Sequence, residues 1–117
     1  MRTKQGIEVF ISLVLEYSAM YLKLHSTPAG EVVAVCDAEL LGMVISDGKR
    51  HLDLKKHASF YQGEKAAPDD VRKALLCAKN ANLVGKKALA AAKKAGIDIS
   101  GAVLISGVPH LQAYSVF

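Results

Sequence analysis

Residues 20–37, MYLKLHSTPAGEVVAVCD, decide the fold. The first part, MYLKLHS, alternates apolar and polar residues around Lys23 and His25, as a half-buried strand does. The composition of STPAG predicts a turn, and the valine-rich EVVAVCD predicts a second strand. We therefore expect these two strands to pair as a hairpin.

Two further strands are predicted in the next part of the chain. LLGMVIS (residues 40–46) is a third apolar run, and the DGKR after it contains Asp-Gly, a strong tight-turn signal. HLDLK (51–55) then resumes the alternation. Residues 56–68 read as a connection, which Phe60 and Tyr61 anchor because large aromatic side chains dominate core burial.

The periodicity changes to helical after Pro68. This proline and the two aspartates that follow it are typical of a helix start. Apolar residues then recur at spacings of three and four over residues 71–82, and an alanine-rich segment continues to Gly96, a typical residue after a helix end. The break at residues 82–85 predicts two helices.

The C-terminal part predicts two more strands, GAVLISG (residues 101–107) and LQAYSVF (111–117). We expect a turn between them, because Gly107 permits a positive φ and Pro109 extends the residue before it. The element order is roughly ββββ-αα-ββ. This order predicts a single-domain α+β fold, with two helices packed on a mixed or antiparallel sheet of about five to six strands.

Length and composition fit one globular domain, which we place at residues 20–117. The chain has 117 residues, a net charge of +4 and a pI of about 9.1, a mild bias that suits a polyanionic partner. The two cysteines form no CxxC pair, which favours reduced thiols and a cytoplasmic location. The apolar core of residues 10–15 is too short for a signal peptide or a membrane span.

Residues 1–19 read as an N-terminal extension, with two interpretations. The segment is either a short element packed on the domain or the product of an over-long gene start, with Met20 as the true first residue.

A basic segment spans residues 71–97 and contains no Asp or Glu. Solvated helices commonly mix both charges, because opposite charges at i, i+4 stabilise a helix. Uncompensated cations suit phosphate binding, although a solvated lysine face is the simpler interpretation. The candidate RNA-binding residues are Arg72, Lys73, Lys79, Lys86, Lys87, Lys93 and Lys94.

No complete catalytic, metal or cofactor motif is present, so no catalytic residue, metal site or cofactor is assigned. Cys36, with His25 on the facing strand, is a candidate nucleophile and base, although a buried inert thiol is the simpler interpretation. If Asn82 caps the second helix, Lys86 and Lys87 would stand beside a candidate anion site at its N-terminus. His110 is a polar residue at the predicted turn, and with Gln112 and Asn82 it is a candidate polar patch that contacts RNA or a partner, although a histidine bonded to a nearby backbone carbonyl is the simpler interpretation.

Four stretches, read together, resemble the archaeal domain-of-unknown-function family 424. They are LKLHSTPAGEVVAVCDAELLG, FYQGE, NANLVG and ISGVPHLQAY. The resemblance covers Met20 to about Phe117 and implies a cytoplasmic protein linked with translation and RNA, with no accepted catalytic residues. It marks a candidate shared surface at His25, Glu31, Cys36, Asp37, Glu39, Gly42, Phe60, Tyr61, Gly63, Asn82, Gly85, Gly107, Pro109 and His110.

The sequence therefore predicts a non-catalytic, RNA- or ribosome-associated protein that acts in translation through a basic helical face. Two alternatives stay open: a small hydrolase-like enzyme that uses Cys36 or His110, and a protein-interaction module of a larger complex, with a protein partner in translation. The sequence predicts no membrane partner and indicates no oligomeric state.

Overall fold

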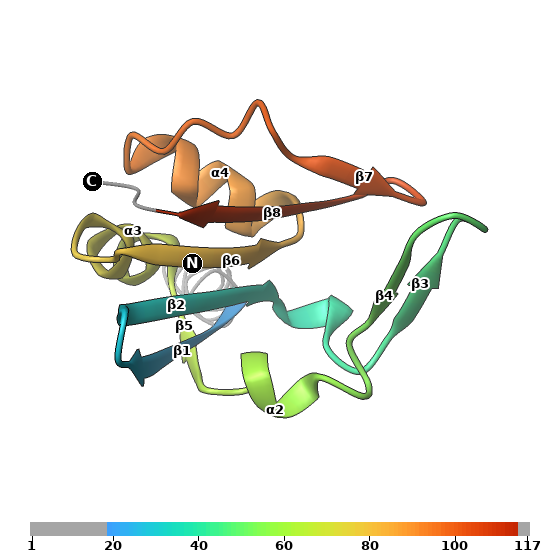
Figure 1. The fold of residues 1–117 in the computed structure, drawn as a ribbon, viewed down its shortest axis with the longest axis horizontal. Helices are drawn as coiled ribbons and strands as arrows, with labels where there is room; N and C mark the ends of the chain where they lie inside the picture. Colours follow the sequence, from blue (N-terminus) through green and yellow to red (C-terminus); the bar gives the residue numbers. More distant parts are fainter. Residues whose placement is uncertain (1–18, 115–117) are drawn as a thin grey trace, which may run out of the picture.

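The computed structural model describes residues 19–114. Six strands form one mixed sheet in the order β5-β1-β2-β6-β8-β7, and β3 and β4 form a separate hairpin (Figure 1). The strands are β1 (Met20–Thr27), β2 (Gly30–Asp37), β3 (Val44–Ser46), β4 (His51–Asp53), β5 (Glu64–Ala66), β6 (Asn80–Val84), β7 (Val103–Ile105) and β8 (Val108–Tyr114). The helices are α2 (Ala58–Tyr61), α3 (Pro68–Leu76) and α4 (Lys86–Lys94), with a 3-10 helix at Ala38–Leu40. The predicted α+β class with a mixed sheet is confirmed.

The hairpin predicted at residues 20–37 is formed by β1 and β2. Their antiparallel register runs from Met20 opposite Asp37 to Thr27 opposite Gly30. Side chains from Val33 to Asp37 are buried on both faces of the sheet. This burial explains why β2 reads as a continuous apolar run, as strands covered on both faces do.

The predicted break between two helices is a central strand of the sheet, which corrects the expected element order. Asn80–Val84 forms β6, which pairs parallel with β2 and antiparallel with β8. Apolar and polar residues alternate over Asn80, Ala81, Asn82 and Leu83, and the two apolar side chains are buried beneath the helices. Five residues between two helical segments are easily mistaken for a break, because the strand period is expressed only twice.

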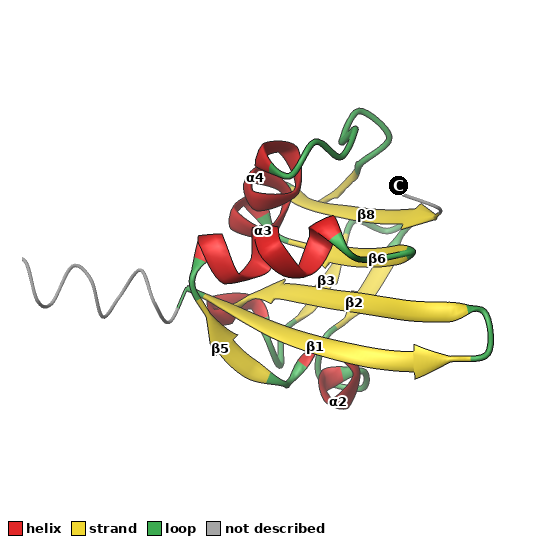
Figure 2. Ribbon diagram, turned by 90° about the vertical axis from the view of Figure 1, so that its left-hand side faces the viewer, coloured by secondary structure: helices red, strands yellow, loops and turns green. Residues whose placement is uncertain are grey.

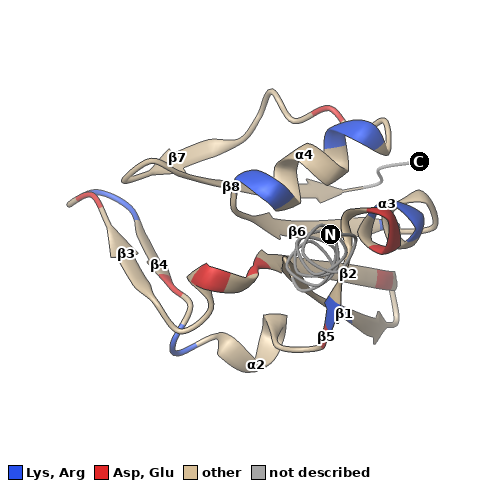
Figure 3. Ribbon diagram, turned by 180° about the vertical axis from the view of Figure 1, so that it is seen from behind, with Lys and Arg blue, Asp and Glu red and all other residues tan. Residues whose placement is uncertain are grey.

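The helices α3 and α4 cover one face of the sheet, as Figure 3 shows from that side and Figure 2 from an adjacent one. Val35, Leu83 and Leu111 point from three neighbouring strands into this core. On α4 the buried residues are alanines and Leu89, which let the helix pack closely against the strands. The predicted start of α3 at Pro68 is confirmed.

The opposite face is covered only in part. Ala34, Cys36 and Val84 pack there against Leu54 of the loop after the β3–β4 hairpin and Tyr61 of α2. The helix α2 on this face, and β5 at the edge of the sheet beside β1, lie within the segment expected to be a connection. The third and fourth predicted strands exist but form their own hairpin outside the main sheet.

The last hairpin turns earlier than expected. Ser106 and Gly107 have φ values of 48° and 84°, as both central residues of a type I′ turn require. The positive φ at Gly107 is confirmed, but the turn does not include residues 108–110, which already lie in β8. Pro109 is tolerated in the strand and accepts a hydrogen bond from the Gly85 amide (2.9 Å).

The predictions for residues 1–18 lie outside the described residues. The same holds for residues 115–117, at the end of the predicted last strand. Within residues 19–114, no helix has the length and hydropathy needed to cross a membrane.

Candidate functional site

The lysines of α4 lie at both ends of the helix (Figure 3). Lys86, Lys87, Lys93 and Lys94 are all exposed, whereas Ala88, Leu89, Ala91 and Ala92 face the core. Lys86 and Lys93 are seven residues apart and therefore share one side of the helix. The sequence-predicted basic face is present on this helix.

Other cations of the basic segment have carboxylate partners from outside it. Asp69 accepts from Arg72 at 2.8 Å and lies 3.4 Å from the Lys73 ammonium, and Glu39 lies 3.4 Å from that of Lys87. These exposed pairs contribute little to stability, but they lower the local positive charge. Among residues 19–114, the cations of the segment without an ion-pair partner are Lys79, Lys86, Lys93 and Lys94.

The N-terminus of α4 is already capped by a carboxylate of this chain. Asp37, at the end of β2, is 2% exposed and accepts hydrogen bonds from the amides of Lys87 (3.0 Å) and Ala88 (2.8 Å). Burial raises the pKa of the Asp37 carboxyl, and the two amide donors oppose this rise. The predicted anion site at the N-terminus of α4 is therefore wrong, because the Asp37 carboxylate takes the position that an anion would occupy. The residue before the helix is Gly85, and Asn82 does not cap it.

Gly85 is the residue that allows this approach. It precedes α4 with φ 108° and ψ 160°, and a Cβ at this position would overlap the Asp37 carboxylate. Beside it lies a cavity of about 450 Å³. Five residues of the shared surface that the family resemblance marked are in its lining: Asp37, Glu39, Gly85, Gly107 and Pro109.

Cys36 does not have the environment of a nucleophile. It is fully buried, and burial together with the charges of Asp37 and Glu39 raises the pKa of its thiol to about 12. His25 is opposite Val32 and not Cys36, which is opposite Tyr21. Four residues of strand separate the two positions by about 13 Å, so the expected pairing of nucleophile and base is wrong.

A polar network on the open face joins three elements that are distant in the sequence. Tyr61 of α2 donates its hydroxyl to Oδ1 of Asn82 on β6 (2.6 Å). Nε2 of His110 on β8 also donates to this oxygen (3.1 Å), since a carbonyl oxygen only accepts. Both donors hold the Asn82 side chain in one orientation, with its amide nitrogen directed elsewhere.

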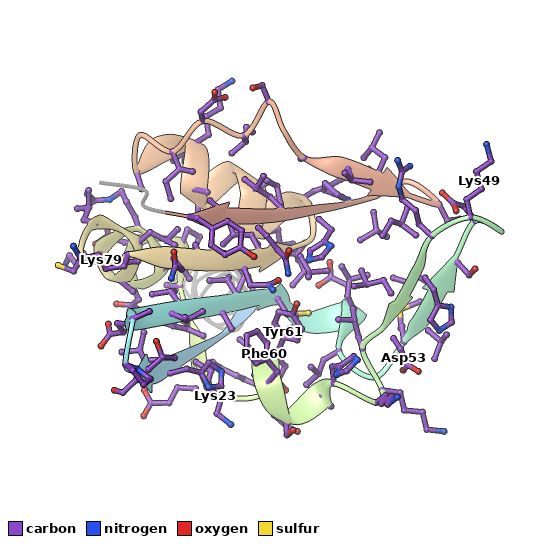
Figure 4. All side chains as sticks on the ribbon, viewed as in Figure 1. Lys23, Lys49, Asp53, Phe60, Tyr61 and Lys79 are labelled. Atoms are coloured by element: carbon purple, nitrogen blue, oxygen red, sulfur yellow. The ribbon has the colours of Figure 1, made fainter. Side chains whose placement is uncertain are left out.

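An aromatic chain continues from this network towards β1. The rings of His25 and Phe60 stack with centroids 4.4 Å apart, and the Phe60 and Tyr61 rings meet edge to face at 5.0 Å. Figure 4 shows Phe60 and Tyr61 rising from α2 in front of the central strands. The structure thus brings together five residues that the family resemblance marked, and the sequence had placed them in four separate elements: His25, Phe60, Tyr61, Asn82 and His110.

The cavity beside this network includes Leu52, Asp53 and Leu54, which the sequence did not single out as site residues. It has a volume of about 330 Å³ and lies between the open face of the sheet, α2 and the β3–β4 hairpin. Its lining is Leu52, Asp53, Leu54, His57, Phe60, Tyr61, Asn82, His110 and Gln112. The polar patch predicted from His110, Gln112 and Asn82 is part of this lining and comes from two neighbouring strands.

Burial lowers the pKa of His110, which makes a testable difference to stability. Below the ordinary pKa of about 6.5 the unfolded chain takes up a proton that the folded chain resists, so stability is full above that pH and declines as the pH falls through it. We expect His110→Gln to remove part of the decline in unfolding free energy between pH 7.5 and 5.5, measured in urea. An unchanged pH dependence in this variant would contradict the assignment.

Among residues 19–114, no group of three or more His, Cys, Asp or Glu side chains is arranged to hold a metal ion.

Comparison with known proteins places the chain in a family. A solved structure with the same fold is that of an uncharacterized conserved protein from Methanopyrus kandleri, with a TM-score of 0.69 and 28% sequence identity. The match covers 83% of this chain and 91% of that one. No curated protein matches the chain with significance. The family model described as Protein of unknown function (DUF424) matches residues 24–116, and the chain therefore belongs to this family.

Proposed function

We propose that this protein binds RNA through the exposed lysines of α4 and acts by binding, without catalysis. The observation that carries the proposal is the outer side of α4. Lys86, Lys93 and Lys94 are exposed there and have no carboxylate partner among the described residues. Phosphate groups suit such a surface, because each contact releases a counterion from the nucleic acid.

The family resemblance supports the ribosome or its RNA as the first target to test. It also supports an archaeal, cytoplasmic protein.

A protein-interaction module is the second candidate function. Among residues 19–114, six large apolar side chains are exposed, but they lie on several different elements: Leu24, Met43, Val44, Leu76, Leu104 and Tyr114. A hydrolase-like role for Cys36 has no support, because a thiol with a pKa of about 12 is protonated at neutral pH.

The test is co-sedimentation of the full chain with ribosomes and total RNA from its own cells, followed by titration of the RNA it retains. If α4 contacts four phosphates, affinity should fall about 50-fold between 50 and 200 mM salt. Absence of any association at 50 mM salt would overturn the proposal.

A double variant locates the surface. We expect Lys86→Glu/Lys93→Glu to weaken RNA binding at least 10-fold. The helix dipole favours the first change and opposes the second, so the effects on stability largely cancel. Lys49→Glu/Arg50→Glu, at the exposed tip of the β3–β4 hairpin, changes the net charge equally and should stay within 2-fold of the unaltered protein. Equal losses in both variants would mean that only total charge matters and not α4.

A further inference from the structure

We propose that the cavity beside Tyr61, Asn82 and His110 binds a nucleobase, carried by a free nucleotide or by an unpaired nucleotide of RNA. The site is built on the open face of the sheet. It does not depend on α4, which covers the opposite face: Ala81, Leu83 and Leu111 point towards the helices, whereas Asn82, His110 and Gln112 point into the cavity.

Asn82 supplies an oriented donor. Its Oδ1 accepts hydrogen bonds from the Tyr61 hydroxyl and from Nε2 of His110, and these two contacts fix the position of the side chain. The amide nitrogen makes no hydrogen bond to the described residues, and no buried polar side-chain atom among them lacks a partner, so this nitrogen reaches the open space. The two N–H groups of the Asn82 amide are therefore available to a ligand as donors at a fixed position.

His110, which lines the same cavity, supplies an acceptor. Because Nε2 carries the proton given to Asn82, Nδ1 of the neutral ring keeps a free lone pair. Burial lowers the pKa of the ring and so favours this neutral form at pH 7. A donor and an acceptor in the lining of one cavity suit a nucleobase, since every base carries donors and acceptors on neighbouring atoms.

The walls suit a flat heterocycle. Leu52 and Leu54 are buried apolar residues of the lining, and Phe60 and Tyr61 add aromatic surface. Proteins that recognise unpaired bases combine such aromatic contacts with hydrogen bonds to the base edge. A volume of about 330 Å³ is at the lower end for small-molecule sites, which fits one base better than a larger ligand.

The rim can accept the phosphate of a nucleotide. Lys55 and Lys56 are exposed and lie in the chain between the lining residues Asp53 and His57. The Asp53 carboxylate is engaged by the amides of both lysines, at 3.1 and 2.7 Å, which fixes the backbone of this rim. Figure 4 places Asp53 on the hairpin side of the cavity, away from Phe60 and Tyr61.

The experiment is a titration of the full chain with AMP, CMP, GMP and UMP, followed by NMR of the histidine ring nitrogens. We expect at least one nucleotide to bind saturably and to shift Nδ1 of His110, with ribose 5-phosphate at least 10-fold weaker. Equal binding of ribose 5-phosphate, or no saturable shift with any of the four nucleotides, would overturn the inference. This measurement needs no variant.

Asn82→Asp is the matched test of the donor. It keeps an oxygen for Tyr61 and His110 but replaces the donating nitrogen, and we expect nucleotide binding to weaken at least 10-fold. Gln62→Glu places the same charge on the exposed residue after α2, outside the cavity lining, and should leave binding unchanged. Undiminished binding in a folded Asn82→Asp variant would contradict the proposed contact.

Single-stranded oligoribonucleotides identify the source of the base. Tighter binding of an oligonucleotide than of its mononucleotide, lost in Asn82→Asp, assigns the site to RNA, and equal affinities assign it to free nucleotides. The Lys86→Glu/Lys93→Glu variant should still bind mononucleotides. Failure of RNA binding through α4 is thereby distinguished from failure of the cavity.

Discussion

Gly85→Ala is expected to lower the free energy of unfolding by about 4 kcal/mol or more. The backbone at Gly85, with φ 108° and ψ 160°, lies in a region that is essentially restricted to glycine, and a side chain there costs about 1–3 kcal/mol. The added Cβ would also displace the Asp37 carboxylate, whose two hydrogen bonds from the α4 amides are worth about 1.5–3 kcal/mol each.

Chemical denaturation followed by circular dichroism measures this loss, and Gly96→Ala is the matched control. Gly96 follows α4 with φ 91°, but among the described residues no atom apart from its chain neighbours lies within 4 Å of the position of its Cβ. Only backbone strain applies there, so we expect a loss of about 1 kcal/mol. Similar losses at the two glycines would show that the contact with Asp37 contributes nothing.

Asp37→Ala is expected to cost about 3 kcal/mol of unfolding free energy. The substitution leaves the amides of Lys87 and Ala88 without their acceptor at a helix N-terminus, and Ala88 is fully buried. Unsatisfied buried donors cost about 1–3 kcal/mol each, and water entering from the neighbouring cavity offsets part of this. Asp37→Asn keeps one acceptor and should lose less.

Asp47→Ala is the control for Asp37→Ala, measured by the same denaturation. Asp47 also accepts two backbone hydrogen bonds, from Lys49 (3.1 Å) and Arg50 (2.8 Å), but its carboxylate is fully exposed in the turn of the β3–β4 hairpin. Water replaces its bonds, so the loss should be much smaller. A loss at Asp47 as large as that at Asp37 would refute the role of burial.

Three glycines and Asp37 show how far local sequence patterns predict the structure. The positive φ at Gly107 and the end of α4 at Gly96 were predictable, because each is set by a turn of a few residues. Gly85 was identified only through the family resemblance. A glycine is needed there because the Asp37 carboxylate, 48 positions earlier in the chain, lies where a Cβ would be. The pairing of β2 with β6 brings the two residues together.

The sequence by itself determined the β1–β2 hairpin, the start of α3, the α+β class and the cations of α4, because periodicity and capping act over a few neighbouring residues. Only the tertiary structure decided that residues 80–84 form the central strand, that Asp37 caps α4, and that Tyr61, Asn82 and His110 share one oxygen. These features depend on pairing between distant segments. Burial and hydrogen bonding across the sheet select that pairing, and no local preference encodes it.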